Sequence, residues 1–444
     1  MQPISIRYAF QPVRRSLATG RVADLFGLDA EETGHSIAEN LLLDIRPGDL
    51  VLFTGPSGSG KSSLLRAAGE QLGAVNAMTY TLLERPLVDA LAGDLPDRLS
   101  RLAACGLSEA RLLLRTPSEL SDGQRYRFRI AVALGYAQGT ESRFLMADEF
   151  AAYLDRTLAK VLAYNLRKLV TRTGIGFLLA TTHEDVTDDL KPDVHVHCRG
   201  EGEILQVRND SARESRPISF ANELHIEEGT AEDWKPFAKW HYRSHHLAFV
   251  KRIVLLKHGD EPIGICVFSC PAASLSLRSR YFGLRNPRSR LALTALNTQM
   301  WLLARVVLNP TYRGAGIAAH FVRQACESCP VPWIETLSAM GHANPFFEHA
   351  GFTRVGIITA SPKRQRGSEG GQYAGRTRLS RETIEKSRHS EPVYYVLDNR
   401  SSSSLSVSER GAGGERFAAS ERKTAPPNPF PKAERGSQNK ESHL

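Results

Sequence analysis

The sequence has 444 residues, of which 41% are hydrophobic and 24% are charged, and its formal net charge is +9. This length exceeds one ordinary hydrophobic core, so we expect two or three domains, and the basic excess favours an anionic partner such as a nucleic acid, a nucleotide or a CoA-like cofactor. Six irregularly spaced cysteines do not form a disulfide framework, and no apolar stretch is free of polar residues over the length of a membrane span. We therefore expect a cytoplasmic protein without membrane insertion.

The first segment of interest contains two aromatic residues and a pair of strands. Residues 35–45 are typical of strands that lead towards a glycine-rich loop. Tyr8 and Phe26 come before that loop, where an aromatic ring can stack on adenine. The alternative for both residues is ordinary packing in the core.

A glycine-rich loop lies between an apolar run, residues 49–54, and a helix-favouring run, residues 63–68. This order of strand, loop and helix is the context that a phosphate-binding loop requires. Its glycines let backbone N–H groups point at a phosphate, Lys61 adds a positive charge beside the β- and γ-phosphates, and Ser62 offers a hydroxyl to Mg²⁺. The predicted ATP-binding residues are Gly55, Pro56, Ser57, Gly58, Ser59, Gly60, Lys61, Ser62 and Ser63.

An acidic pair follows the next clear strand. Residues 143–147 are mainly apolar and end at Asp148 and Glu149. Phosphoryl transfer needs one acid to hold Mg²⁺ and one to deprotonate the attacking water, so Asp148 is the predicted metal ligand and Glu149 the predicted base. A further apolar strand, residues 175–180, leads to His183, and such strand ends line the ligand crevice of a parallel sheet.

This ordered set of motifs resembles the ABC-type ATPases. Residues 120–124 match the family's LSGGQ signature loop, with Asp122 as the one substitution. The resemblance implies that Ser121 and Gly123 of one copy approach the γ-phosphate held by a second copy, so that ATP joins a head-to-tail homodimer. It also implies that His183 is the switch histidine and that residues 154–155 link the two sites. We assign residues 1–212 to this domain.

The first domain departs from the family in its switch loop. No glutamine stands at the expected place between Lys61 and Ser121, and Glu84 or Thr81 is the candidate to replace it. The same interval is short, and in ABC transporters it holds the subdomain that docks on membrane subunits. This argues against a transporter engine, and a separate membrane partner stays an alternative.

A second α/β pattern begins after a polar linker and extends over residues 213–399. Strands are expected near residues 224–227, 253–257, 262–270 and 302–308, with a helix near 231–240. The last of these strands leads to an RxxGxA turn, whose backbone N–H groups and helix start suit a pyrophosphate. The predicted cofactor-binding residues of this turn are Arg313, Gly314, Gly316 and Ala318, and the alternative is a helix start built from small residues.

The continuation of the second domain resembles the GNAT acyltransferases. Residues 333–337 predict a strand, and residues 344–352 predict a helix that ends in Gly-Phe. The resemblance implies an α+β fold that holds acetyl-CoA or another acyl-CoA at the RxxGxA turn. In many members a tyrosine four residues before that glycine protonates the leaving thiolate, but here the residue is Phe347. Either another group is the acid, or acyl transfer from CoA is not the reaction.

His241 and Tyr242 are the predicted catalytic residues of the second domain. A His-Tyr pair among basic and aromatic residues supplies acid and base groups and a surface for stacking a base, and the alternative is a solvated helix end. The segment resembles the HY-containing motif of Mom-type phage DNA modification proteins. An arginine-rich stretch with interleaved aromatics is compatible with DNA or RNA contact, and a solvated loop is its alternative; its arginines are Arg278, Arg280, Arg285, Arg288 and Arg290.

The C-terminal part combines a basic insertion, residues 361–388, a last strand, residues 392–397, and a disordered tail, residues 400–444. We therefore predict an α/β protein with an ABC-type ATPase domain, a GNAT-like α+β domain and a tail. The leading hypothesis is ATP-driven dimerisation that gates an acyltransferase acting on a nucleic-acid base. The alternatives are an N-acetyltransferase for a protein or small amine, and a transporter ATP-binding subunit with a ligand-sensing domain.

Overall fold

The computed structural model describes residues 2–9, 16–27, 34–140, 142–241, 247–284, 289–342, 344–359 and 391–400. The chain divides into two compact units: Met1–Glu223 with Asn309–Ile317, and Leu224–Leu308 with Ala318–Leu444. The change of unit thus comes later than the boundary expected at residue 212. The predicted basic insertion, and the predicted tail apart from residue 400, lie outside the described residues.

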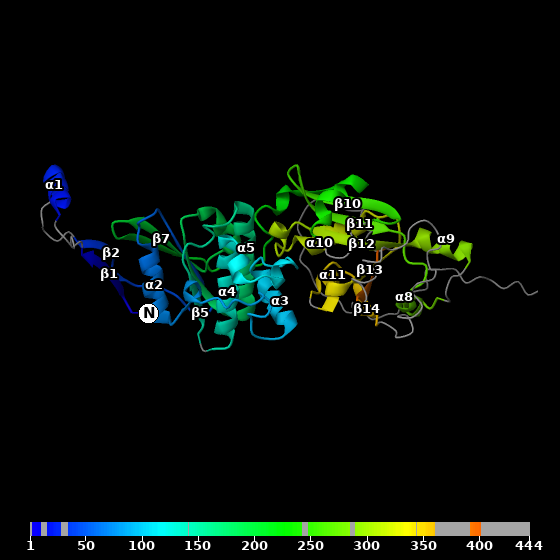
Figure 1. Ribbon diagram of the computed structural model, residues 1–444, viewed down its shortest axis with the longest axis horizontal. Coiled ribbons are helices and arrows are strands. Elements are labelled where there is room, and N and C mark those ends of the chain that lie inside the picture. The colour runs from blue at the N-terminus through cyan, green and yellow to red at the C-terminus, as the bar shows by residue number, and fades with distance from the viewer. Residues whose placement is uncertain are drawn as a thin grey trace, which may run out of the picture. The chain divides into compact units, whose positions relative to one another are not determined.

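A six-stranded sheet forms the centre of the first unit (Figure 1), in the order β4-β5-β6-β3-β7-β8. All neighbouring pairs are parallel except β7 and β8. Every residue of β3 is buried, as expected for a parallel strand that is covered on both faces. The strands are β3 (Leu50–Thr54), β4 (Val75–Asn76), β5 (Phe144–Ala147), β6 (Gly176–Thr181), β7 (Val194–Gly200) and β8 (Glu203–Arg208).

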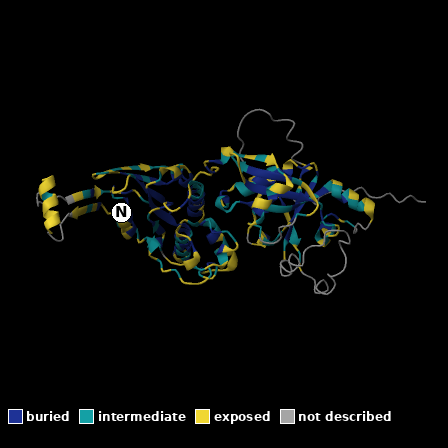
Figure 2. Ribbon diagram, turned by 45° about the horizontal axis from the view of Figure 1, so that its top comes forward, coloured by how far each residue is buried: buried dark blue, intermediate teal, exposed yellow. Residues whose placement is uncertain are grey.

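Helices and a hairpin cover the two faces of this sheet. One face packs against α3 (Leu95–Ala104), α4 (Asp122–Gln138) and α5 (Arg156–Thr173). The other face packs against α2 (Lys61–Leu72) and the antiparallel strands β1 (Ile4–Ala9) and β2 (Gly34–Leu41). Figure 2 shows buried residues in the centre of this unit, and the phosphate-loop strand β3 lies in this interior.

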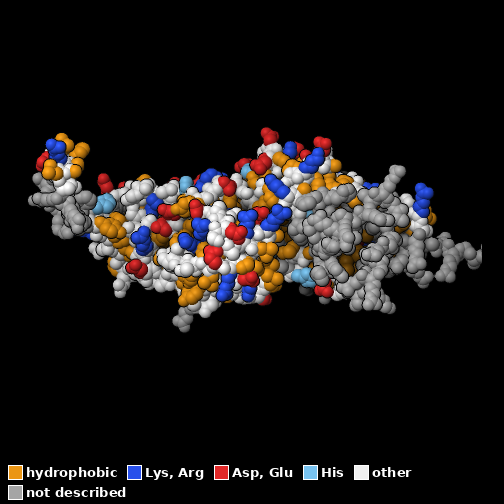
Figure 3. All heavy atoms as spheres, viewed as in Figure 1, with side chains coloured by type: hydrophobic (Ala, Val, Ile, Leu, Met, Phe, Trp, Pro, Cys, Tyr) orange, Lys and Arg blue, Asp and Glu red, His pale blue; other side chains and the backbone are white. Residues whose placement is uncertain are grey.

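Helix α1 (Leu17–Phe26) lies between β1 and β2 in the chain and has no buried residue. Leu17, Leu25 and Phe26 are 86%, 79% and 75% exposed, and Figure 3 shows hydrophobic side chains on the surface of this helix. Packing in the core, the alternative considered for Phe26, is therefore wrong.

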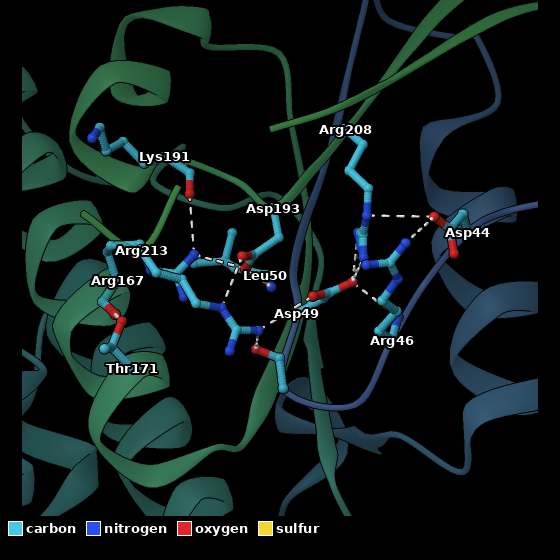
Figure 4. A network of polar contacts seen from close by, with 11 residues as sticks. Asp44, Arg46, Asp49, Leu50, Arg167, Thr171, Lys191, Asp193, Arg208 and Arg213 are labelled. Carbon is cyan, nitrogen blue, oxygen red and sulfur yellow. Dashed lines mark hydrogen bonds and ion pairs between the residues drawn. The ribbon is translucent and has the colours of Figure 1, made fainter. Parts of the chain in front are cut away.

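Charged side chains, two of them buried, hold the start of β3 in place (Figure 4). Asp193 accepts hydrogen bonds from the Leu50 N–H and from Arg167 Nη1, both at 2.7 Å, and from Arg213 Nε at 3.2 Å. The side chains of Asp193 and Arg167 are each only 8% exposed. Since a buried charge needs a partner, these contacts fix the strand that leads into the phosphate loop.

Asp49 makes a second set of ionic contacts beside Asp193. Its Oδ2 accepts from Arg208 Nη2 at 2.9 Å and from the Arg46 N–H at 2.8 Å. Burial raises the pKa of Asp49, although the neighbouring guanidinium groups act in the opposite direction. The end of β8 is thereby tied to the residue that immediately precedes β3.

A seven-stranded sheet forms the centre of the second unit, in the order β14-β15-β13-β12-β11-β10-β9. Only β12 and β13 pair in parallel, over Met300–Leu303 of β12, whereas β11 pairs with β12 as far as Leu308. The strands are β9 (Leu224–Glu228), β10 (Val250–His258), β11 (Glu261–Ser269), β12 (Met300–Leu308), β13 (Trp333–Ser338), β14 (Thr353–Ile357) and β15 (Val393–Asp398).

The helices of this part of the chain are short, and they are α7 (Trp234–Ala238), α8 (Ser276–Tyr281), α9 (Arg290–Gln299), α10 (Ile317–Glu327) and α11 (Phe346–His349). Within the described ranges, none of the helices of either unit combines the length and apolar character that crossing a bilayer requires.

Arg278 contradicts the expectation of a nucleic-acid contact. It is 1% exposed, and its Nη1 donates to Glu335 Oε1 at 2.9 Å. Tyr394 Oη donates to the other oxygen of Glu335, also at 2.9 Å. Burial raises the pKa of Glu335 despite these partners. The prediction is wrong for this arginine because α8 turns it into the core, while Arg285 and Arg288 lie outside the described residues.

Candidate functional site

The phosphate loop occupies the turn between β3 and α2. Gly55, Gly58 and Gly60 have φ angles of +140°, +81° and +89°, which side chains rarely adopt. A Cβ atom at Gly55 would lie 1.9 Å from Cys198 O, and one at Gly60 would lie 2.3 Å from Ile37 Cγ2. The loop therefore depends on glycine both for its backbone shape and for its close approach to neighbouring elements.

Two side chains of this loop fit a phosphate ligand. Lys61 is buried, its Nζ donates to Pro56 O at 2.6 Å, and desolvation lowers its pKa. Ser59 Oγ is buried and finds no hydrogen-bond partner among the described residues. A buried cation and an unused hydroxyl at a helix start are groups that a nucleotide's phosphates would satisfy.

Ser62 and Asp148, the predicted metal ligands, are brought together from α2 and the end of β5. Ser62 Oγ donates to Asp148 Oδ1 at 3.1 Å. A hydroxyl and a carboxylate are suitable ligands for Mg²⁺, which keeps several of its waters in such sites. When bound, Mg²⁺ neutralises the negative charge that gathers on the phosphates.

Glu149 is held in an unusual backbone conformation. Its φ angle is +53°, and its N–H donates to Asp148 Oδ1 at 3.0 Å. Tyr153 Oη donates to Glu149 Oε2 at 2.7 Å, and this hydrogen bond raises the pKa of the tyrosine. Tyr153 positions the predicted base, and sequence reasoning gave it no role. The available signal was a hydroxyl four residues beyond the acidic pair.

His183 follows β6 at the edge of the sheet where β5 also ends. Its N–H donates to Thr181 Oγ1 at 3.1 Å, and that hydroxyl donates to Phe150 O at 2.8 Å. Phe150 N–H donates in turn to Ala180 O at 2.7 Å. These hydrogen bonds connect the segments that follow β5 and β6. His183 and the acidic pair therefore lie at the same edge of the sheet.

The signature loop forms the start of α4. Ser121 caps this helix, with its Oγ accepting from the Gln124 N–H at 3.3 Å and its own N–H donating to Gln124 Oε1 at 3.1 Å. A Cβ atom at Gly123 would lie 2.8 Å from Tyr153 O, so the loop packs directly on the segment that follows Glu149. The approach of Ser121 and Gly123 to a second copy's phosphate loop stays a prediction.

Tyr8 lies beside the phosphate loop. Its hydroxyl is 3.0 Å from Ser63 Oγ, and the residue is 52% exposed. The core-packing alternative is therefore wrong for Tyr8 as well. Of the two aromatic candidates, Tyr8 is the one that contacts the start of α2, and its stacking on adenine stays a prediction.

The two candidates for the switch residue line a hollow of about 420 Å³, together with Tyr80, Ser118, Arg125 and other residues. Glu84 Oε2 accepts a hydrogen bond from Ser118 Oγ at 2.9 Å. This hydrogen bond connects Glu84 to the segment before the signature loop. That Glu84 or Thr81 replaces the switch glutamine stays a prediction.

The RxxGxA segment belongs to the first unit by its contacts, except for Ala318, which belongs to the second unit. Gly314 and Gly316 have φ angles of +93° and +79°, and Ala318 lies in the first turn of α10. Arg313 Nη1 donates to Ser108 O at 3.3 Å, and desolvation lowers the pKa of Arg313. Lys168 of α5 donates to Gly314 O at 2.8 Å. The glycine turn expected from the sequence is present, and protein groups contact it.

The predicted catalytic pair of the second domain is only partly described. The ring of His241 lies 5.6 Å from that of Trp234 in an edge-on arrangement, whereas Tyr242 lies outside the described residues. Phe347 is buried among other aromatic rings.

Together these features define the first unit as a Mg²⁺-dependent nucleotide-binding unit of the phosphate-loop type. They are the glycine loop with its buried Lys61, the Ser62–Asp148 contact, and Glu149 bound by Tyr153. No family model matches the chain.

Comparison with curated proteins finds relatives that match part of the chain. The chain is 30% identical over 185 residues to the lipoprotein-releasing system ATP-binding protein LolD of Maricaulis maris, covering 32% of this chain and 78% of the relative. It is 30% identical over 206 residues to the spermidine/putrescine import ATP-binding protein PotA of Thermotoga maritima, covering 38% and 54%. The chain therefore belongs to the ATP-binding cassette family of ATPases, which confirms the predicted resemblance.

The matches are partial in both directions. The chain spans a little over half the length of the import proteins, 54% for PotA and 58% for the sulfate/thiosulfate import ATP-binding protein CysA 2 of Rhizobium meliloti. Among solved structures, a dimeric post-hydrolysis state of the ATP-binding cassette MJ0796 bound to ADP and Pi has a TM-score of 0.34 at 18% identity, covering 47% of this chain and 97% of that one.

Proposed function

We propose that the first unit binds and hydrolyses ATP in a head-to-tail homodimer. The observation that carries this proposal is the meeting of Ser62 and Asp148 beside a glutamate that Tyr153 holds in place. Glu149 accepts the proton of the attacking water, and Lys61 stabilises the charge that develops on the phosphates. Ser121 and Gly123 of the second copy complete the site.

The replacement Glu149→Gln tests this proposal. Since glutamine does not accept the proton, ATP turnover should fall at least about 100-fold while binding persists. The variant should then elute as an ATP-dependent dimer in size exclusion with light scattering. Glu70→Gln, on the exposed side of α2, is the matched control and should behave as wild type. A Glu149→Gln variant that stays monomeric with normal turnover would refute the assigned base.

We propose further that dimerisation gates a GNAT-like N-acyltransferase in the second unit, with acyl-CoA as donor and a nucleic-acid base as acceptor. Support comes from the pairing of β13 with β12, which ends at Leu303 while β12 runs on to Leu308. An extended cofactor arm fits beside a strand whose parallel partner has stopped. The net charge of +9 suits a polyanionic substrate.

Mass spectrometry of nucleosides from cells with and without the gene tests the acceptor class. An added acyl mass on one base supports the proposal. Unchanged nucleosides together with an acylated protein amine would favour the N-acetyltransferase alternative.

A transporter role is the second candidate, because the relatives' names describe import and lipoprotein-releasing systems. Membrane subunits that co-purify with the chain in detergent would favour this role, with the second unit as a ligand sensor.

A further inference from the structure

The signature loop contains one residue that the proposed dimer does not explain. In the family motif LSGGQ a glycine stands between the serine and the second glycine, whereas this chain has Asp122 at that place. Its two neighbours, Ser121 and Gly123, are the residues proposed to contact the γ-phosphate that a second copy holds. Asp122 therefore puts a negative side chain into the part of the loop that receives a negative ligand.

The start of α4 has backbone groups available for an anion. The Gln124 N–H donates to Ser121 Oγ, and the Arg125 N–H donates to Ser121 O. The N–H groups of Asp122 and Gly123 come before them and donate to no acceptor in the described part of the chain. Free N–H groups and the positive end of the helix dipole attract negative charge. The phosphate of a second copy and the Asp122 carboxylate are thus drawn to the same helix end.

The Asp122 side chain faces solvent and pairs with Arg125. It is 80% exposed, and its Oδ1 accepts from Arg125 Nη1 at 3.0 Å. Arg125 is fixed from the other side, because its Nη2 donates to Leu120 O at 3.0 Å and its Nε to Pro117 O at 3.4 Å. The ion pair is neutral as a whole. Removing the carboxylate would therefore leave a positive group at the place where the phosphates arrive.

Asp122 also has a local structural role. A carboxylate in the first turn complements the helix dipole, and its pairing with an arginine three residues later adds a little stability to α4. Both effects act within one copy. A residue with this role alone would stabilise the first unit and leave the association of two copies unchanged, so the strength of the dimer separates the two roles.

We infer that the Asp122 carboxylate weakens the ATP-dependent homodimer, an inference that rests on the proposed function. When two copies meet, the triphosphate of one copy approaches the carboxylate of the other, and like charges brought together at an interface oppose association. The two copies then separate more readily than they would with glycine at this position. Residue 122 thereby sets how long ATP keeps the two copies together.

The test compares Asp122→Asn and Asp122→Gly in the full-length chain, each combined with Glu149→Gln so that ATP is not consumed. Analytical ultracentrifugation with ATP and Mg²⁺ gives the Kd of the dimer. Asparagine removes the charge with little change of shape, and glycine restores the residue of the family motif. Each should lower this Kd at least about tenfold relative to Glu149→Gln alone. The difference should shrink between about 0.1 M and about 1 M NaCl, where the Debye length falls from about 10 Å to about 3 Å.

The control is Glu70→Gln in the same background, which removes a carboxylate from the exposed side of α2 and should leave the Kd of the dimer unchanged. Thermal melting without ATP shows whether each variant folds. If Glu149→Gln and both Asp122 variants stay monomeric with ATP, the proposed homodimer is overturned. If the dimer forms and neither Asp122 variant lowers its Kd, or if the difference persists at high salt, only the role of Asp122 is overturned.

Discussion

Replacing Asp193 with alanine should lower the free energy of unfolding of the first unit by about 3–5 kcal/mol, the range for breaking a buried ion pair by removing one partner. Three donors lose this carboxylate: the Leu50 N–H, Arg213 Nε, and Arg167 Nη1, which keeps a hydrogen bond to Lys191 O at 3.1 Å. The loss of the negative charge costs most at Arg167, because its side chain is only 8% exposed. Asp193→Asn keeps a carbonyl acceptor and should lie between wild type and alanine.

Urea unfolding can assign this loss to the first unit. The chain has four tryptophans, Trp234, Trp240, Trp301 and Trp333, and all belong to the second unit. Tryptophan fluorescence therefore reports the second unit, while far-UV circular dichroism reports both. With a slope of about 2 kcal/mol per molar urea, the first unit's midpoint should fall by roughly 1.5–2.5 M.

Asp210→Ala is the matched control, because this carboxylate is exposed in the same region, and its effect should stay within about 0.5 kcal/mol. A loss below about 1 kcal/mol for Asp193→Ala would show that the network does not hold β3. A fluorescence transition that shifts as far as the dichroism transition would show that the loss is not confined to the first unit.

Two further outcomes are expected. Tyr8→Ala should raise the Kd for ATP by about 5- to 150-fold, the range for losing one base–aromatic stack, while Tyr8→Phe should change the Kd little. Titration calorimetry with ATP and with inorganic triphosphate measures this. An equal loss of affinity for both ligands would contradict adenine stacking. Burial, followed by the charge of His197, lowers the pKa of His195 from 6.5 to about 4. Between these pH values the unfolded chain binds the proton more readily, so acidification should destabilise the wild type by at most roughly 3 kcal/mol. His195→Gln, which keeps a polar partner for Thr54, should lose less stability between pH 7 and pH 4.5 in urea unfolding, and an equal loss would contradict the assignment.

The nucleotide site could largely be predicted because its chemistry lies in short contiguous segments. The order of strand, loop and helix around Lys61 predicts which atoms face a phosphate. An acidic pair after an apolar strand predicts the positions of a metal ligand and a base. The meeting of Ser62 with Asp148 follows from the parallel sheet. The role of Tyr153 was missed, because a hydroxyl four residues after an acidic pair is a weak signal in the sequence, whereas the structure shows it bound to Glu149.

The second unit was harder to predict because its decisive contacts join distant residues. In the sequence Arg278 of α8 resembles the neighbouring arginines, but in the structure it is buried and pairs with Glu335 of β13. Phe347 packs against the ring of Tyr395 in the last strand, and the spacing between the two residues contains no periodic signal. Pairwise burial across a sheet is set by register, which composition does not encode.

The sheet order of the first unit has a consequence for how the chain is made. β3 lies between β6 and β7, and Asp193 and Arg213 bind the residues at its start. A ribosome releases the chain from its N-terminus, so the phosphate loop emerges long before the strands and ions that hold it. The phosphate loop of a nascent chain therefore reaches its folded conformation only after residue 213 has left the ribosome. A chain that stops earlier contains the motif but lacks the contacts that hold β3.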